Sequence, residues 1–390
     1  MLTESLEILA RLIAFPTVSR DGNLDLIAYA EAILRDAGAQ TSRVVSEDGR
    51  KANLHAVFGP RNQPGVMLSG HTDVVPVDGQ EWRSDPFVLR SEDGTLYGRG
   101  TADMKGFIAC ALAMARRMKG LDLRTPLTIS LSYDEEVGCL GVRRLLDMMQ
   151  SMPVQPRFCI VGEPTLMQVV SAHKGKTAAR IECVGVEAHS SLPDAGLNAI
   201  HMACDIIAGL RRLQSDICCH GHHDGAYEVA HTTVHVGRIH GGEALNIVPN
   251  LCWFDFEIRH LPQDDIDGLL AAVEAVIAHV RHQARERFPQ ADVRLVPLSS
   301  YPALDTPAEA EVIAFVKSLT GGNSTGKISF GTEGGLYASR LGIPTVVCGP
   351  GSIAQAHKPD EFIETSQMAA CAAMLERLVE RLRQGIGQIA

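Results

Sequence analysis

The spacing of apolar residues predicts alternating helices and strands in the first part of the chain. From residue 2 to 14, leucine and isoleucine recur every three or four positions, which is typical of a helix with one buried face, and Pro16 ends it. A second helical pattern, 24–37, ends at Gly38. Short apolar runs predict strands at 41–45, 53–58, 66–69, 126–132 and 157–161, and helical spacing predicts helices at 103–118 and 140–149. This alternation predicts an α/β sheet covered by helices on both faces.

The order of predicted helices and strands changes near Ala172. The next elements are expected in the order strand, helix, strand, strand, helix, strand, at 176–184, 198–213, 232–236, 251–258, 265–287 and 293–297. This order is the split βαβ arrangement of a ferredoxin-like α+β domain. Helix and strand patterns alternate again at 308–319, 335–341 and 344–348. We therefore predict a discontinuous first domain, 1–174 and 302–390, interrupted by an inserted domain, 175–301.

Composition narrows the class of protein. The 390 residues include 46 acidic and 36 basic side chains, for a formal net charge of −10. Binding to nucleic acid or to an anionic membrane without sequence preference needs a concentrated basic surface, so both partners are disfavoured. The N-terminus carries acidic residues where a secretory signal would be basic, and no apolar run approaches the ~20 residues that span a bilayer. The ten scattered cysteines suit reduced thiols, and we expect a cytoplasmic protein.

The stretch around His71 is the first candidate for chemistry. His71 and Asp73 follow an apolar run and stand two positions apart, so in an extended segment both side chains point the same way. Asp73 can then accept the proton on one ring nitrogen and leave the other nitrogen free for a metal. Taken alone, the stretch is more simply interpreted as the polar end of a strand.

Further acids and a second imidazole follow other predicted strands or begin predicted helices. They are Asp103, Glu135, Glu136, Glu163 and His357. Ligands of open α/β sheets gather beyond the carboxyl ends of the strands, so we expect these residues to converge there. Two imidazoles and several carboxylates suit two zinc-like ions about 3.5–4 Å apart, with Asp103 the candidate bridge. Of the adjacent acids 135 and 136, one can bind metal while the other accepts the proton of an attacking water.

Five blocks of the sequence closely resemble the di-zinc aminoacylase family, which includes acetylornithine deacetylases, succinyl-diaminopimelate desuccinylases and carboxypeptidase-like members. The blocks are 70–76 (GHTDVVP), 98–106 (GRGTADMKG), 134–138 (DEEVG), 162–165 (GEPT) and 356–357 (AH). The resemblance covers essentially the whole chain, including the inserted domain. It implies a two-domain hydrolase whose inserted domain acts as a lid and joins two subunits into a homodimer.

The resemblance also implies which side chains hold the ions. The expected cofactor is two Zn²⁺, with Co²⁺ as an alternative, held by His71, Asp103, Glu136, Glu163 and His357. On this pattern Asp103 bridges the ions, His71 and Glu163 bind one of them, and Glu136 and His357 bind the other.

Other roles follow from the same resemblance. Glu135 would be the general base, and Asp73 would orient the ring of His71. His189 resembles the lid histidine that reaches the partner subunit's site and polarises the scissile carbonyl. Asn246 and Arg259 resemble lid residues that hold the substrate carboxylate, a task that suits a fork-shaped guanidinium.

Within the family, the C-terminal blocks 330–335 (FGTEGG) and 348–361 (CGPGSIAQAHKPDE) are most similar to acetylornithine deacetylases. Desuccinylases tend to have Asp where Glu333 stands. We hypothesise that Glu333 receives the side-chain ammonium of the substrate, because a buried ammonium needs a paired acid. The expected reaction is removal of the acetyl group from N2-acetyl-L-ornithine, a step of arginine biosynthesis. The alternatives are a deacylase of another N-acyl amino acid, such as N-succinyl-diaminopimelate, and, more distantly, a metal-stabilised binding protein without turnover.

Three other stretches partly match motifs for binding a dinucleotide, a nucleoside triphosphate or a further metal, but each match is incomplete. Residues 98–103 begin like a dinucleotide fingerprint, but Asp103 occupies the position of the third glycine and would repel a pyrophosphate. Residues 321–327 (GGNSTGK) have P-loop spacing, yet a helix pattern precedes them and Ile328 replaces the magnesium-binding hydroxyl, so we expect a loop. The soft ligands of 218–224 (CCHGHHD) match no zinc spacing and are expected to form an exposed, incidental cluster in a lid loop.

Overall fold

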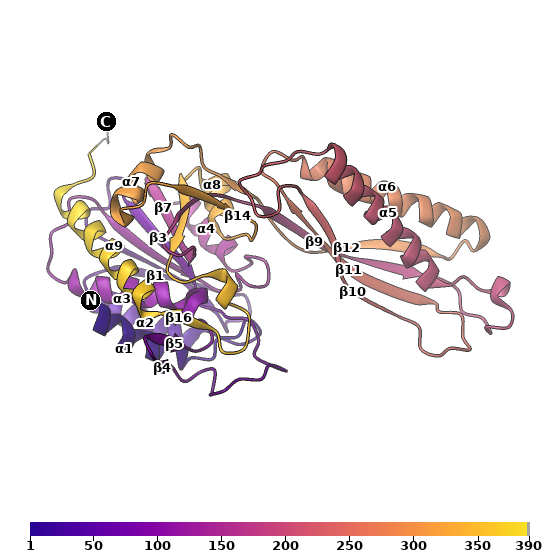
Figure 1. Cartoon of the computed structure of the whole chain (residues 1–390), viewed down its shortest axis with the longest axis horizontal. Helices are drawn as coiled ribbons and strands as arrows, with labels where there is room; N and C mark the ends of the chain where they lie inside the picture. Colours follow the sequence, from indigo (N-terminus) through magenta and orange to yellow (C-terminus); the bar gives the residue numbers. More distant parts are fainter. Residues whose placement is uncertain (388–390) are drawn as a thin grey trace. The chain divides into compact units, whose positions relative to one another are not determined.

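The computed structural model describes residues 1–387, which form two units (Figure 1). Unit 1 comprises Met1–His173, Leu304–Lys327 and the chain from Thr332 onward, and unit 2 comprises Lys174–Ala303 and Ile328–Gly331. These boundaries lie next to the predicted ones, 174/175 and 301/302. The short piece 328–331 joins unit 2 without any signal in the apolar pattern.

Unit 1 is built on a nine-stranded mixed sheet. Its strands lie in the order β1 (Gln40–Val45), β2 (Ala52–Phe58), β6 (Leu127–Ser132), β3 (Val66–His71), β7 (Phe158–Pro164), β15 (Thr345–Gly349), β8 (Val169–His173) and β13 (Leu304–Asp305), with β14 (Thr325–Ile328) paired to β8. The four central strands β6, β3, β7 and β15 are parallel, so their carboxyl ends share one edge. A separate three-stranded sheet contains β16 (Phe362–Glu364), β5 (Thr95–Tyr97) and β4 (Arg90–Glu92).

Helices cover both faces of the large sheet, which confirms the predicted fold class. One face carries α1 (Leu2–Ile13), α2 (Leu24–Asp36), α3 (Gly106–Arg117), α7 (Glu311–Thr320) and α9 (Thr365–Gln384). The other face carries α4 (Val142–Gln150) and α8 (Gly334–Leu341). The central strands are therefore buried on both sides, which explains why their sequences are nearly continuous apolar runs.

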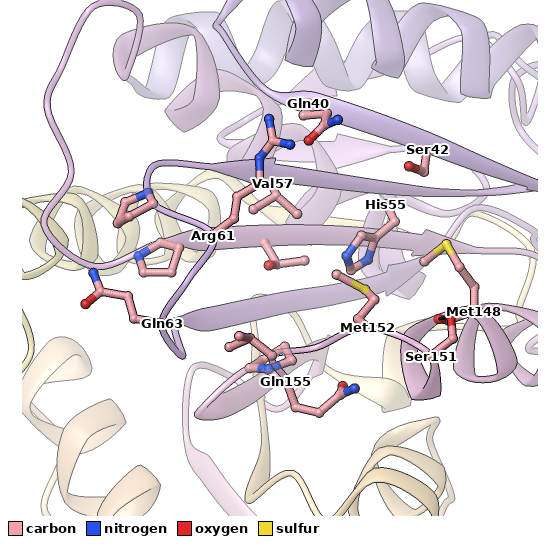
Figure 2. A pocket seen from close by; sticks show the side chains of 16 residues that line it. Gln40, Ser42, His55, Val57, Arg61, Gln63, Met148, Ser151, Met152 and Gln155 are labelled. Atoms are coloured by element: carbon pink, nitrogen blue, oxygen red, sulfur yellow. Dashed lines mark hydrogen bonds between the residues drawn. The ribbon is translucent and has the colours of Figure 1, made fainter.

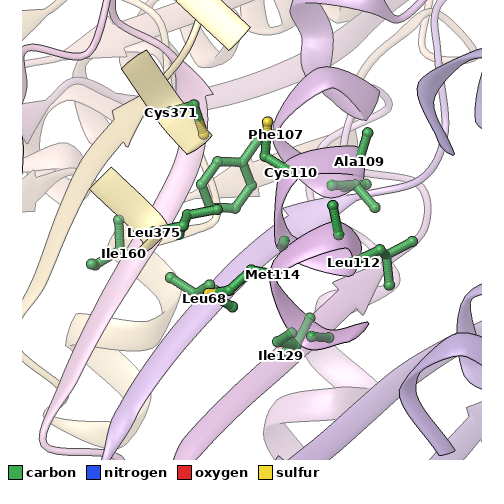
Figure 3. Close-up of a cluster of buried hydrophobic side chains, with 14 of the residues drawn as sticks. Leu68, Phe107, Ala109, Cys110, Leu112, Met114, Ile129, Ile160, Cys371 and Leu375 are labelled. Carbon is green, nitrogen blue, oxygen red and sulfur yellow. The ribbon is translucent and has the colours of Figure 1, made fainter. Parts of the chain in front are cut away.

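The main core of unit 1 surrounds α3. Every residue of this helix from Gly106 to Ala115 is buried, because the helix lies between the sheet and other helices. Figure 3 shows Phe107 and Cys110 of α3 beside Cys371 and Leu375 of α9. Strand β7 approaches this helix so closely that a Cβ atom added at Gly162 would lie only 2.0 Å from the ring of Phe107. Tight packing of this kind fixes the strand ends that carry the candidate ligands.

Unit 2 has the predicted ferredoxin-like order of elements. Along the chain these are β9 (Gly175–Val184), η2 (Pro193–Ala195), α5 (Ala199–His220), β10 (Thr233–Gly241), β11 (Leu251–His260), α6 (Ile266–Arg287) and β12 (Asp292–Tyr301). The four strands form an antiparallel sheet in the order β10-β11-β9-β12. Alternate residues of β11, such as Phe254 and Phe256, are buried against α5 and α6 in a core of their own.

The structure corrects two predicted elements. The helix expected to start at Asp103 begins at Gly106, because residues Thr101–Lys105 form an irregular turn, η1, in which Asp103 is not helical. Helix α5 runs to His220 instead of ending near 213, since Ile217 continues its buried stripe after Ile206 and Leu210. The first three residues of the 218–224 cluster are therefore helical rather than part of a loop. Helix α9 lies in a part of the chain for which the apolar pattern predicted no element.

Two further expectations concern cysteine and membranes. All ten cysteines are free thiols, and seven of them are buried, as packing residues would be. Within residues 1–387, no helix combines the length and the apolar character needed to cross a membrane.

The imidazole of His55 on β2 should make stability depend on pH. It is 4% exposed, its Nδ1 lies 3.0 Å from Ser130 Oγ, and burial lowers its pKa from 6.5 to about 4. Because the unfolded chain binds this proton at higher pH than the folded one, stability should be full above pH 6.5 and fall as the pH drops to about 4. The loss should be about 3 kcal/mol. Urea unfolding at pH 7 and pH 4 should show this extra loss in the wild type relative to His55→Gln, and equal losses would contradict it.

Candidate metal centre

The candidate ligands lie at the carboxyl edge of the parallel strands, all within unit 1. His71 is the last residue of β3, and Glu163 is near the end of β7. Glu135 and Glu136 lie in the turn after β6, while His357 lies in the loop that follows β15 and the short helix η3 (Ile353–Gln355). Because parallel strands bring their carboxyl ends together, residues spread over almost 290 positions of sequence meet at one edge.

Asp103 lies between the two imidazoles. Its Oδ1 is 3.0 Å from Nε2 of His71, and its Oδ2 is 3.1 Å from Nε2 of His357. Although burial favours the neutral acid, hydrogen bonds from His357 and His71 hold the pKa of Asp103 well below its usual range. An ionised carboxylate that presents one oxygen to each imidazole has the geometry of a group that bridges two ions.

The remaining acids divide between the two imidazoles. Oε1 of Glu163 lies 3.4 Å from Nε2 of His71, and Oε2 of Glu136 lies 3.1 Å from Nε2 of His357. Within residues 1–387, two sets of ligand atoms come close enough to hold an ion: those of His71, Glu135 and Glu163, and those of His71, Asp103 and Glu136. The sequence-predicted ligands are thus brought together. Glu135, however, lies as near to one candidate ion position as a ligand would, so the geometry alone does not separate the base from the ligands.

The electrostatics of the cluster favour a bound cation. Burial, and then the charge of Asp103, raise the pKa of Glu163 to about 8 and that of Glu136 to about 7. Hydrogen bonds to Asp103 and Glu136 raise the pKa of His357 to about 11. Four crowded acids and two imidazoles form a set that divalent ions would neutralise. Nitrogen and oxygen donors of these types suit zinc, so the residues fit the metal that the sequence implies.

Asp73 connects His71 to the turn that carries the two glutamates. The Nδ1 of His71 lies 3.0 Å from the backbone oxygen of Asp73 and 3.6 Å from its carboxylate. The carboxylate accepts hydrogen bonds from Ser19 Oγ at 2.7 Å and from the backbone N–H groups of Glu135 and Glu136 at 3.2 and 3.3 Å. Asp73 therefore holds the backbone of both acids as well as facing the histidine ring, which is more than the orienting role expected from sequence.

A buried ion pair that the sequence reasoning missed supports Asp103. The Oε2 of Glu361 accepts a hydrogen bond from Arg99 Nη1 at 2.6 Å, and both side chains are 1% exposed. The Oε1 of Glu361 accepts from the backbone N–H groups of Ala102 and Asp103 at 3.0 and 3.1 Å. Both charged residues lie inside the motif blocks, but they are 262 positions apart and nothing local in the sequence pairs them.

Glu333 lies in unit 1, on the sheet face covered by α8. It is 1% exposed, and its Oε2 accepts a hydrogen bond from Ser69 Oγ at 3.4 Å. Ser69 in turn lies 3.0 Å from the hydroxyl of Tyr337. Among residues 1–387 the other oxygen of Glu333, Oε1, has no hydrogen-bond partner, and burial raises the pKa of this acid to about 7. The role of Glu333 in binding substrate stays a prediction.

The three lid candidates belong to unit 2. His189 is exposed, its Nδ1 accepts hydrogen bonds from the backbone N–H and the hydroxyl of Ser191, and it forms an isolated bridge with Ile247 beside Asn246. Arg259 lies at the end of β11, where its Nε donates to Glu257 at 2.7 Å. Their convergence on the metal ligands stays a prediction.

The soft ligands of 218–224 do not assemble a site of three ligands. Sγ of Cys218 lies 3.2 Å from Nε2 of His231, and His222 pairs with Asp264 at 2.7 Å. Both groups of three or more candidate ligands found within residues 1–387 belong to the cluster around His71.

The fold and this cluster define a hydrolase that works with metal ions. The family model for peptidase family M20/M25/M40 matches residues 67–381, and the chain belongs to this metal-dependent family. It is 35% identical to an acetylornithine deacetylase of Klebsiella pneumoniae (strain 342), over 96% of each chain, and 35% identical to one of Myxococcus xanthus, over 95% of each.

Solved structures of the family share the fold. A tripeptidase from Staphylococcus aureus superposes with a TM-score of 0.78 at 18% identity and covers 99% of each chain. A metallo-carboxypeptidase from Sulfolobus solfataricus gives a TM-score of 0.78 at 17% identity, covering 98% of this chain and all of that one. A dinuclear metal binding peptidase from Bacillus subtilis gives 0.62 at 14% identity, over 97% and 98% of the two chains.

Proposed function

We propose that the chain hydrolyses the acetyl amide of N2-acetyl-L-ornithine, giving L-ornithine and acetate, and so acts in arginine biosynthesis. The observation that carries the proposal is the position of Asp103, whose two oxygens face His71 and His357 while Glu135 lies in the same cluster. A site that only stabilised the fold would not need a further acid beside the ligands. The identity to acetylornithine deacetylases along nearly the whole chain supports the acyl amino acid as the substrate class.

Glu135 is the residue that moves the proton in this proposal. When bound, the metal ions polarise the acetyl carbonyl and make a nearby water more acidic. Glu135 takes a proton from that water while the oxygen of the water forms a bond to the carbonyl carbon. Glu135 then gives the proton to the amide nitrogen as the C–N bond breaks, so that acetate and the free amine leave. Burial, together with the neighbouring acids, raises the pKa of Glu135 well above its usual value, which makes it a stronger base.

Residues of unit 2 complete the proposed site. We propose a homodimer formed through this unit, in which His189 donates a hydrogen bond to the carbonyl oxygen in the partner's site. Arg259 and Asn246 would hold the substrate carboxylate. The Nε of Arg259 donates to Glu257 at 2.7 Å, and its side chain is also hydrogen-bonded to Tyr301. These two contacts would orient the planar guanidinium for a carboxylate.

Glu333 should distinguish the cationic substrate from neutral ones. Its unpartnered Oε1 is a buried acceptor that an ammonium would satisfy, and hydrogen bonds to charged groups typically contribute about 1.5–3 kcal/mol. Relative to the wild type, Glu333→Gln should therefore lower kcat/KM for N-acetylornithine roughly tenfold or more beyond the loss measured with N-acetylnorvaline, which lacks the amine. Steady-state kinetics with both substrates test this. An equal loss on the two would assign Glu333 a structural role only.

The proposed function is tested with metal-loaded protein and a panel of substrates. Release of amine is followed for N-acetylornithine, N-acetylnorvaline and N-succinyl-diaminopimelate, with Glu135→Ala as the blank. The highest kcat/KM should belong to N-acetylornithine. Preference for the succinyl compound would replace the proposed substrate, and turnover of none of them would leave a metal-stabilised binding protein as the better account.

A further inference from the structure

Unit 1 contains a cavity that lies away from the metal centre. It has a volume of about 300 Å³, and its lining includes Gly65 and Pro126, the residues that precede β3 and β6. Figure 2 shows the side chains that line it. His71 is at the opposite end of β3, and Glu135 and Glu136 follow the opposite end of β6. Since β3 has six residues, the two sites are separated by roughly 20 Å along the strand.

One face of three neighbouring strands forms the floor of the cavity. Ser42 pairs with His55 across β1 and β2, and Val57 pairs with Thr128 across β2 and β6. Paired residues of adjacent strands point to the same face, so these side chains line one surface. The opposite wall comes from the end of α4 and the segment after it, where Met148 and Met152 supply apolar surface (Figure 2).

Two buried polar atoms face this cavity without a partner among residues 1–387. They are Nε2 of His55 and Oε1 of Gln155. His55 is only 4% exposed and its other nitrogen is engaged by Ser130. The carboxamide of Gln155 is held by its Nε2, which donates to the backbone oxygen of Met149 at 2.5 Å. Buried polar atoms are nearly always hydrogen-bonded, so two that border one cavity indicate a ligand that satisfies both.

A cationic side chain stands at the rim. Arg61, in the connection between β2 and β3, lines the cavity next to the backbone that leads to Gly65 (Figure 2). No ion pair is recorded for its guanidinium in the described part of the chain, 1–387. A guanidinium in this position suits a carboxylate, with which it can form two parallel hydrogen bonds.

We propose that this cavity binds a small amphipathic carboxylate that carries one N–H or O–H group. Its apolar body would lie against Met148, Met152 and Val57, its carboxylate would pair with Arg61, and its donor would reach Oε1 of Gln155. His55 Nε2 would complete the contacts, as donor or acceptor according to its tautomer. A cavity of this volume is at the lower end of the range for small-molecule sites, and such sites combine apolar walls with few polar groups. The proposal stands independently of the reaction at the metal centre.

Indole-3-acetate has the required groups and serves as the probe. Its affinity for the full-length protein is measured by isothermal titration calorimetry at millimolar concentrations. Ser42→Trp places a large side chain on the cavity face of β1, and His55→Phe removes the unpartnered nitrogen. Val45→Trp is the matched control, because Val45 is on the same strand but points to the other face and is already exposed. His71→Ala reports binding at the metal centre instead.

The proposal expects saturable binding of one probe per chain. Ser42→Trp and His55→Phe should each weaken it at least tenfold, while Val45→Trp and His71→Ala should leave it unchanged. Absence of saturable binding would overturn the proposal. So would binding that is lost in His71→Ala and kept in Ser42→Trp, because the probe would then occupy the metal centre.

Discussion

Replacing Glu135 by glutamine should abolish turnover while the metal content stays at the wild-type level. The amide has nearly the same shape as the acid, but it cannot accept a proton from water at neutral pH. Loss of a positioned general base typically lowers the rate about 10²- to 10⁴-fold. Among residues 1–387, the side chain of Glu135 accepts a single hydrogen bond, from the thiol of Cys139 at 3.4 Å, so the substitution should disturb little else.

The neighbouring residue provides the contrast for this test. Glu136 lies 3.1 Å from His357 and should be a ligand, so Glu136→Gln should lower metal content together with activity. Glu47→Gln, on an exposed side chain of the same unit, should change neither. Rates are measured with N-acetylornithine, and bound metal by elemental analysis. If Glu135→Gln retained a tenth of the wild-type rate, or lost metal as Glu136→Gln does, Glu135 would not be the base.

Replacing Glu361 by alanine should destabilise unit 1 by about 3–5 kcal/mol. The change leaves the guanidinium of Arg99 buried without its carboxylate, and uncompensated buried charges carry a cost of this size. It also removes the acceptor for the N–H groups of Ala102 and Asp103, so the turn that carries Asp103, the proposed bridging acid, should loosen. Affinity for metal should therefore fall as well.

The preceding residue supplies the matched control. Asp360 lies 3.5 Å from Arg83 in a pair whose arginine is 83% exposed, and exposed pairs of this kind contribute about 0–1 kcal/mol. Urea unfolding should thus separate Glu361→Ala from Asp360→Asn by at least 2 kcal/mol. Similar unfolding midpoints for the two variants would show that the buried pair does not hold the turn.

The strands and the convergence of the candidate ligands could be predicted because both rest on local signals in the sequence. An apolar run such as 66–69 predicts a buried strand, and a polar residue such as His71 directly after it marks the edge where ligands gather. The ferredoxin-like order of unit 2 could be predicted from the apolar pattern in the same way. The buried residues of β11, for example, are the alternate apolar residues of its sequence.

Other features depend on residues that only the fold brings together. The pairing of Arg99 with Glu361 joins distant segments, and the cavity around His55 is formed by three strands and the chain after α4. The start of α3 was misplaced by three residues because η1 keeps Asp103 out of helical geometry. No spacing rule in the sequence expresses such long-range geometry.

Asp73 is a residue whose role could be predicted only in part from the sequence. Its position two residues after His71 predicted an orienting role for the imidazole. The structure adds hydrogen bonds from Ser19 and from the backbone of the two glutamates, so one carboxylate links the end of β3 to the turn that carries Glu135, the proposed base. These contacts span more than 50 positions of sequence and could not be inferred from it.

Metal stoichiometry tests the central claim, that Asp103 joins two ions in a hydrolytic centre. Metal-free protein is titrated with Zn²⁺ while bound metal and the rate of N-acetylornithine hydrolysis are measured together, for the wild type and for Asp103→Ala. The wild type should bind two ions per chain and gain its activity as they bind, whereas Asp103→Ala should lose affinity for both ions and remain inactive. Binding of a single ion by the wild type, or two ions retained by Asp103→Ala with unchanged affinity, would contradict the account.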